Sequence, residues 1–131
     1  MQQAYQDSMA ICAKFGKPTF FLTFTCNPKW TEITNSIPSY QSASDRPDVV
    51  ARVYDLKKNE MIEDIQKRQV LGAVTARIHV IEFQKRGLPH CHMLIWIDEP
   101  HIPTTSADID RTIHAEIRKP TQDFIKSSCQ T

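Results

Sequence analysis

The run from His90 to Ile97, HCHMLIWI, restricts the possible folds of this chain more than any other feature. It is apolar, and it is far shorter than the about 20 residues that cross a bilayer, so it predicts a buried β-strand. Side chains alternate between the two faces of a strand, which puts His90 and His92 on one side and Cys91 on the other. Burying such polar rings is costly unless they find partners, so the fold must supply groups that bind them.

A second strand is predicted directly before this one, at 73–84 (AVTARIHVIEFQ), with 85–89 (KRGLP) as the connection. Two neighbouring strands joined by a connection of this kind form a hairpin. We expect Gln84 to lie opposite His90 and Glu82 opposite His92, with opposed Cβ atoms about 5 Å apart. One face of the predicted hairpin then gathers four polar side chains: Glu82, Gln84, His90 and His92.

This group of four predicts a site for a divalent metal ion. Imidazoles are common metal ligands, and two nitrogens with one carboxylate oxygen leave open positions for water or phosphate. We expect His90 and His92 to be two ligands, with Glu82 as the first choice for the third and Gln84 as the second. The competing interpretation is that one histidine packs and the other is exposed, because short motifs often arise by chance.

The other histidines are not expected to join this group. His79 has the opposite parity from Glu82 and so faces the other side of its strand, while His101 and His114 are predicted at the surface. Residues that could contact DNA near the site are polar, basic or aromatic. They are Asn27, Lys29, Trp30, Lys85 and Arg86. The alternatives are a core position for Trp30 and a plain charged hairpin tip for Lys85 and Arg86.

The rest of the chain supplies a further strand and the helices that cover a sheet. Periodicity and breaker residues predict a helix over 2–15 and then a strand over 19–25 with much of both faces covered. A short helix follows, capped by Asn27 and Pro28 and running through Trp30 and Ile33, and residues 35–47 form a loop. An amphipathic helix is predicted over 48–68, and a last helix runs from the capping box Thr105–Asp108 to Pro120. With the hairpin, this order predicts an α+β fold in a single domain over 1–131.

Composition limits the function classes. The net charge of +1 is too balanced for non-specific nucleic-acid binding by bulk charge, so any binding surface must be local. No GxxxxGK[ST] loop is present, which excludes P-loop helicase activity within these residues. Cys12, Cys26, Cys91 and Cys129 form no CxxC pair, so we expect reduced thiols that pack as small hydrophobic residues rather than a zinc ribbon.

Four segments are similar to one family of transposon proteins. Residues 81–96 (IEFQKRGLPHCHMLIW) resemble the His-hydrophobic-His motif of Helitron Rep proteins, and 21–30 (FLTFTCNPKW) resemble a second motif of that family. Residues 46–57 (RPDVVARVYDLK) resemble the helix between the two motifs, and 5–18 (YQDSMAICAKFGKP) are similar as well. These segments cover nearly the whole chain in the family's order. Such Helitron helicase-like domains, which do not contain the helicase itself, belong to the HUH endonucleases of rolling-circle replication.

The resemblance implies an antiparallel sheet with flanking helices that holds Mg²⁺ or Mn²⁺ through the two histidines and a third polar ligand. By this resemblance His90 and His92 are the motif histidines, Glu82 or Gln84 completes the set, and the strand 21–25 lies beside the metal strands. The metal polarises a phosphate of single-stranded DNA, and a tyrosine attacks it to leave a 5′-phosphotyrosine and a free 3′-hydroxyl. The family's role in DNA transposition implies a nuclear location and no membrane association.

The family's nucleophilic tyrosines follow the metal motif, whereas the tyrosines of this sequence are Tyr5, Tyr40 and Tyr54, all upstream of it. We therefore expect a domain that is incomplete at its C-terminus and works with downstream tyrosine and helicase segments. Alone it should bind metal and DNA without forming a phosphotyrosine, because the covalent step lacks its nucleophile. Denaturing electrophoresis with a labelled single-stranded oligonucleotide checks this prediction, and a band of covalently attached protein would contradict it.

Three other interpretations of the histidine motif compete with this function. The first is a binding module for metal or single-stranded DNA without catalysis, and the second is a decayed transposon relic in which the histidines merely pack. The third is a histidine-triad nucleotide hydrolase, whose motif begins similarly. That motif requires a further histidine where this chain has Leu94, and an aliphatic side chain cannot act as a nucleophile.

Overall fold

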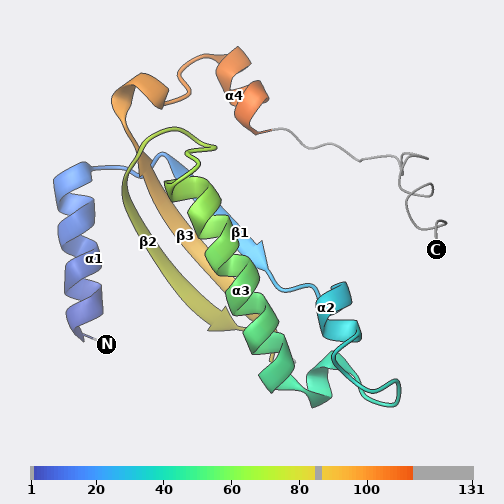
Figure 1. Cartoon of the computed structure of the whole chain (residues 1–131). Coiled ribbons are helices and arrows are strands. Elements are labelled where there is room, and N and C mark those ends of the chain that lie inside the picture. The colour runs from blue at the N-terminus through green and yellow to red at the C-terminus, as the bar shows by residue number, and fades with distance from the viewer. Residues whose placement is uncertain (1, 85–86, 114–131) are drawn as a thin grey trace.

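The computed structural model describes residues 2–84 and 87–113 of the chain (Figure 1). The described elements are α1 (Gln2–Phe15), β1 (Phe20–Thr25), α2 (Thr31–Thr34), a 3-10 turn η1 (Ala43–Asp45), α3 (Pro47–Gln66), β2 (Val74–Phe83), β3 (Pro89–Ile97), a 3-10 turn η2 (Glu99–His101) and α4 (Ser106–Thr112). An antiparallel sheet with helices around it confirms the predicted α+β class and the predicted order of elements. Within these residues no helix has both the length and the apolar content that a membrane crossing requires.

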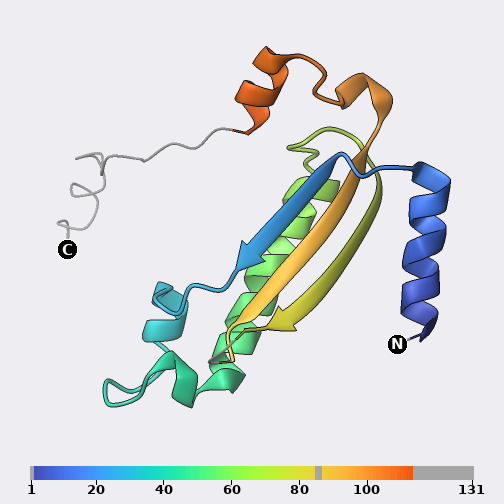
Figure 2. The ribbon, with the colours of Figure 1, turned by 180° about the vertical axis from the view of Figure 1, so that it is seen from behind.

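The sheet has the order β1-β3-β2, so the histidine strand β3 is central (Figure 2). Both neighbours run antiparallel to it, with Thr25 opposite His90 on one side and Glu82 opposite His90 on the other. The strand at 21–25 therefore lies beside β3, as predicted, while β2 is on the far side of β3. A central position fixes the backbone of β3 by hydrogen bonds on both edges, which gives its side chains a defined direction.

The core lies between the sheet and α3, which crosses one face of it (Figure 1). Val50 and Tyr54 of α3 pack in one buried cluster with Cys91, Met93 and Ile95 of β3. These five side chains are at most 2% exposed. The Tyr54 hydroxyl donates a 2.8 Å hydrogen bond to the carbonyl oxygen of Phe24, so the buried phenol is satisfied and ties α3 to β1.

The opposite face of the sheet is largely open at β1, which contradicts the prediction that both faces of that strand are covered. Exposure alternates along β1, with Phe20, Leu22 and Phe24 turned inward and Phe21, Thr23 and Thr25 exposed. Helix α1 stands beside β2 (Figure 2), and a groove between this helix and the sheet is lined by Ile78, Val80 and Leu94 from the strands. An aromatic, branched composition favours a strand but does not reveal how many of its faces are covered.

Two predicted helix boundaries differ in the structure. Helix α2 begins at Thr31 with Trp30 as its cap, because the Asn27 side chain instead accepts a 2.9 Å hydrogen bond from the Lys29 backbone and closes a local turn. The capping box at Thr105 and Asp108 is confirmed as the start of α4. Helix α4 ends at Thr112 with Ile113 in an extended conformation, so it stops before the predicted end at Pro120, and residues 114–120 lie outside the described residues.

Gly72 occupies the turn between α3 and β2 in a conformation that other residues rarely adopt, with a φ of +108°. A Cβ at this position would lie 2.6 Å from the Cβ of His101 and 3.1 Å from Cγ2 of Ile97. We expect Gly72→Ala to lower the free energy of unfolding by at least about 2 kcal/mol, because backbone strain and a clash with fixed atoms add together.

Gly16 is the matched control for this prediction, since its φ is +72° and a Cβ there would meet nothing within 4 Å. Gly16→Ala should cost about 1 to 2 kcal/mol, from the left-handed conformation alone. Urea unfolding of the two variants beside the unmodified chain measures the difference. Equal costs would contradict the close approach of η2 to Gly72.

Candidate metal centre

The two histidines of β3 lie on the open face of the sheet, as the alternation predicted. Their ring centroids are 4.5 Å apart and the planes meet at 73°, so one ring presents its edge to the other. Both rings are partly exposed, while Cys91 between them is fully buried against α3. The strand therefore separates a packing side from a side that offers imidazole nitrogens to solvent.

The predicted hairpin register is wrong by two residues. Glu82 lies opposite His90 and Val80 lies opposite His92, while Gln84 stands beyond the end of β2. The backbone of Gln84 closes the hairpin, because its N–H donates to the Leu88 carbonyl at 2.9 Å and its carbonyl accepts from the Gly87 N–H at 2.9 Å. The connection is tighter than predicted because Gly87 adopts a φ of +73°, which permits a short hairpin loop.

Glu82 is the acidic side chain that this register brings to the histidines. Its Oε2 lies 3.4 Å from Nε2 of His92, diagonally across the hairpin. Two ligands at about 2.1 Å from one ion would lie about 3.0 to 3.4 Å apart, so this spacing fits a shared divalent ion. Among residues 2–84 and 87–113, no three His, Cys, Asp or Glu side chains form a ready-made ligand group. Glu82 and His92 are in contact, and the centroid of the His90 ring lies 4.5 Å from that of His92.

Two residues of β1 contact the histidine rings, and sequence reasoning did not single them out. Thr25 Oγ1 is hydrogen-bonded to Nδ1 of His90 at 2.7 Å, which leaves Nε2 as the ring nitrogen for an ion. Phe21 stacks on His92 with 5.8 Å between ring centroids and 10° between planes. The alternation of side chains along β1 was the sequence signal that could have identified both residues. Phe21, Thr23 and Thr25 lie on the same face as the two histidines once β1 pairs with β3.

The residues predicted to contact DNA are placed unequally around this site. Asn27 and Lys29 are exposed and follow β1 at the end of the sheet where His90 lies. Trp30 is partly buried, stacks on Phe24 at 5.9 Å and has the Lys57 ammonium 5.1 Å from its ring centre. Lys85 and Arg86 lie outside the described residues. DNA contact by any of these side chains stays a prediction.

His79 faces α3, away from the other histidines, as its parity predicted. Its Nδ1 lies 2.8 Å from the Arg77 guanidinium, and burial lowers the pKa of His79 first, followed by the charges of Arg77 and Lys58. Lys58 is 7% exposed and pairs with Asp55. These groups form a partly buried basic cluster under α3 that favours a neutral imidazole.

The lowered pKa of His79 gives stability a pH dependence. Since the folded-state pKa lies below the ordinary 6.5, the unfolded chain binds more protons at mildly acidic pH. The contribution of His79 to the free energy of unfolding is complete above about pH 6.5 and is lost as the pH falls from there through the lower folded-state pKa. We expect His79→Gln to flatten the decline in unfolding free energy over this window. Chemical denaturation of the unmodified chain and the His79→Gln variant at a series of pH values measures this difference. If the unfolding free energy of both falls equally with pH, His79 is not the group responsible.

The other residues singled out in the sequence are the surface histidines and the cysteines. His101 is exposed in η2, and His114 and Cys129 lie outside the described residues. Cys26 and Cys91 are free and buried, and burial raises the pKa of both thiols, which confirms their packing role. Cys12 is free and partly buried.

The three tyrosines of the chain differ in availability. Tyr54 is 2% exposed and its hydroxyl donates a hydrogen bond to the carbonyl oxygen of Phe24, so it cannot present an oxygen to a substrate on the open face. Tyr5 on α1 and Tyr40 in the loop before η1 are 67% and 82% exposed.

The family model for the Helitron helicase-like domain at the N-terminus matches residues 1–95. The chain belongs to the Helitron helicase-like family. The match contains β1 and β2 whole and β3 through Ile95, and so includes Glu82, His90 and His92. Membership in this family indicates a transposon-related role. A search of curated proteins found no match.

Proposed function

We propose that this Helitron helicase-like domain binds Mg²⁺ or Mn²⁺ and takes part in nicking and transferring single-stranded DNA during rolling-circle transposition. One observation supports this most: Glu82 and the two histidines of β3 converge on an open sheet face in a domain of this family. An open, polar face can admit a polymer, whereas a closed pocket would admit only a small molecule.

The protein's own residues prepare this face for a phosphodiester. Nε2 of His92 and Oε2 of Glu82 would hold the ion together with Nε2 of His90, whose other nitrogen Thr25 engages. The bound ion would polarise a phosphate oxygen and stabilise the charge that develops there. Lys29, whose backbone N–H closes the Asn27 turn, offers a cation for a neighbouring phosphate.

The proposed reaction needs a tyrosine that the family places downstream of the metal motif. Its phenolate oxygen would bond to the phosphorus while the bond to the 3′ oxygen breaks, and the departing oxygen would take a proton to become the free 3′-hydroxyl. The proposed partners are therefore single-stranded DNA and the downstream tyrosine and helicase segments of a transposase, in the nucleus.

Metal-dependent DNA binding tests this proposal. Fluorescence anisotropy with labelled dT20, a sequence-neutral single strand, should show affinity that rises with Mn²⁺ by between about 5-fold and 150-fold over EDTA. The His90→Ala/His92→Ala variant should bind dT20 equally in both conditions. Equal affinity of the unmodified chain with and without Mn²⁺ would overturn the proposal, as would a metal response that survives in the variant.

A further inference from the structure

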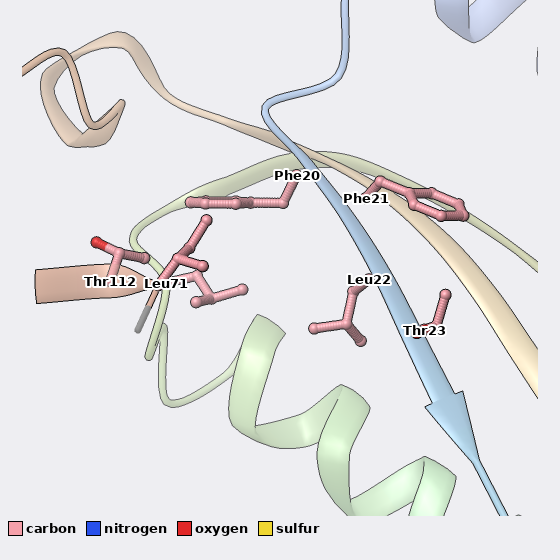
Figure 3. A pocket seen from close by; sticks show the side chains of 7 residues that line it. Phe20, Phe21, Leu22, Thr23, Leu71 and Thr112 are labelled. Atoms are coloured by element: carbon pink, nitrogen blue, oxygen red, sulfur yellow. The ribbon is translucent and has the colours of Figure 1, made fainter. Parts of the chain in front are cut away.

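Phe21 is an exposed aromatic ring directly beside the candidate metal ligands. It is 65% exposed and lies nearly parallel to the His92 ring. Figure 3 shows Phe21 and Thr23 on one side of β1 and Phe20, Leu22 and Leu71 on the other, so Phe21 points away from the core. One face of the ring is turned toward His92, and its exposure leaves the remaining ring surface to solvent.

An exposed aromatic side chain needs no explanation by itself, because single apolar residues are common on protein surfaces. Phe83 is a comparable case, 64% exposed on the opposite face of the sheet. Phe21 differs because its ring stacks on His92, a candidate ligand, at the open face of the sheet. A groove of about 380 Å³ beside β1 is lined mainly from the other side of the strand, by Phe20, Leu22 and Leu71, so it is not the surface that the Phe21 ring offers to solvent.

We propose that Phe21 is a stacking platform for the nucleobase next to the phosphate bound at the metal centre. This inference rests on the proposed function and assigns a base-binding subsite to it. A base has a flat π-face whatever its identity, so a ring beside the phosphate site can fix the strand without reading its sequence. The order His92, Phe21, base would place the phosphodiester at the ion as the base stacks on the solvent-exposed face of the Phe21 ring.

Binding of two probes, dT20 and a 20-nucleotide abasic strand with the same backbone, separates stacking from phosphate contact. We expect Phe21→Ala to weaken dT20 binding between about 5-fold and 150-fold, the range for losing one base stack. It should not change binding of the abasic strand. Phe21→Trp should keep the affinity for dT20, and Phe83→Ala is the matched control that should leave both affinities unchanged. Mn²⁺ affinity of Phe21→Ala should equal that of the unmodified chain.

The possible results separate this inference from the proposed function. If the unmodified chain binds dT20 with Mn²⁺ and Phe21→Ala binds it equally well, the subsite is wrong and the function stands. If Phe21→Ala loses Mn²⁺ binding or weakens both strands equally, Phe21 positions His92 and is not a base platform. If the unmodified chain binds neither Mn²⁺ nor dT20, the proposed function fails and this inference with it.

Discussion

Replacing both His90 and His92 by alanine should abolish saturable binding of Mn²⁺ to this chain. The two imidazoles supply the nitrogen ligands of the candidate centre, and their centroids lie only 4.5 Å apart on one open face. Loss of a single group that merely supports a ligand usually costs about 10- to 100-fold in metal affinity. Loss of two ligands should therefore lower the affinity by at least about 100-fold. Calorimetric titration of Mn²⁺ into the purified chain and the double variant measures the effect.

Single variants show which oxygen ligand completes the site. Glu82→Gln should weaken Mn²⁺ binding, because the carboxylate beside His92 loses its charge. Gln84→Ala should leave it unchanged, since Gln84 lies beyond the end of β2. His101→Ala is the control for removal of an exposed imidazole elsewhere. Undiminished binding in the double variant would place the metal at another site, and no binding in the unmodified chain would leave Glu82 and the histidines without a metal role.

Alternation along a strand predicted the face of each site residue correctly. The rule that neighbouring side chains point to opposite sides follows from backbone geometry alone, and it placed His90 and His92 together and Cys91 in the core. The same parity separated His79 from the site. These assignments needed no knowledge of what packs on the strand, which explains why they were within reach of sequence reasoning.

Register was harder to predict, because it depends on the geometry of one turn. Gly87 adopts a left-handed conformation that permits a shorter hairpin connection than predicted. Glu82 therefore lies opposite His90, whereas the predicted register placed it opposite His92. A shift of two residues keeps every side chain on its face, so Glu82 stayed beside the histidines. A shift of one would have turned it toward α3 and removed the carboxylate from the site.

The roles of Phe21 and Thr25 could not be read from the sequence without knowing which strand lies beside β3. Their segment predicted a strand, yet only the pairing of Thr25 with His90 shows that its hydroxyl reaches a ring nitrogen. How many faces of β1 are covered depends equally on the path of α1, which follows β2 rather than β1 (Figure 2). Both features depend on contacts between segments distant in the sequence, which the local composition of a strand does not determine.

Ile95→Ala should lower the free energy of unfolding by about 2 to 5 kcal/mol, the range for removing a large buried aliphatic side chain. Ile95 is 0% exposed in the central strand and packs in the cluster that α3 covers. A cavity there cannot easily close, because β3 is held by pairing on both edges. Urea denaturation followed by circular dichroism gives the free energy, and Ile95→Val should cost only about 0.5 to 1.5 kcal/mol.

Leu94 is the matched control, since it is the preceding residue of the same strand and points to the open face. It is only partly buried, in the groove beside α1. Part of its apolar surface stays in contact with water, so Leu94→Ala should cost at least about 1 kcal/mol less than Ile95→Ala. Equal costs would mean that both faces of β3 are equally covered in solution. The face that holds Glu82, His90 and His92 would then be closed to a DNA strand, so this stability difference also tests the access on which the proposed function depends.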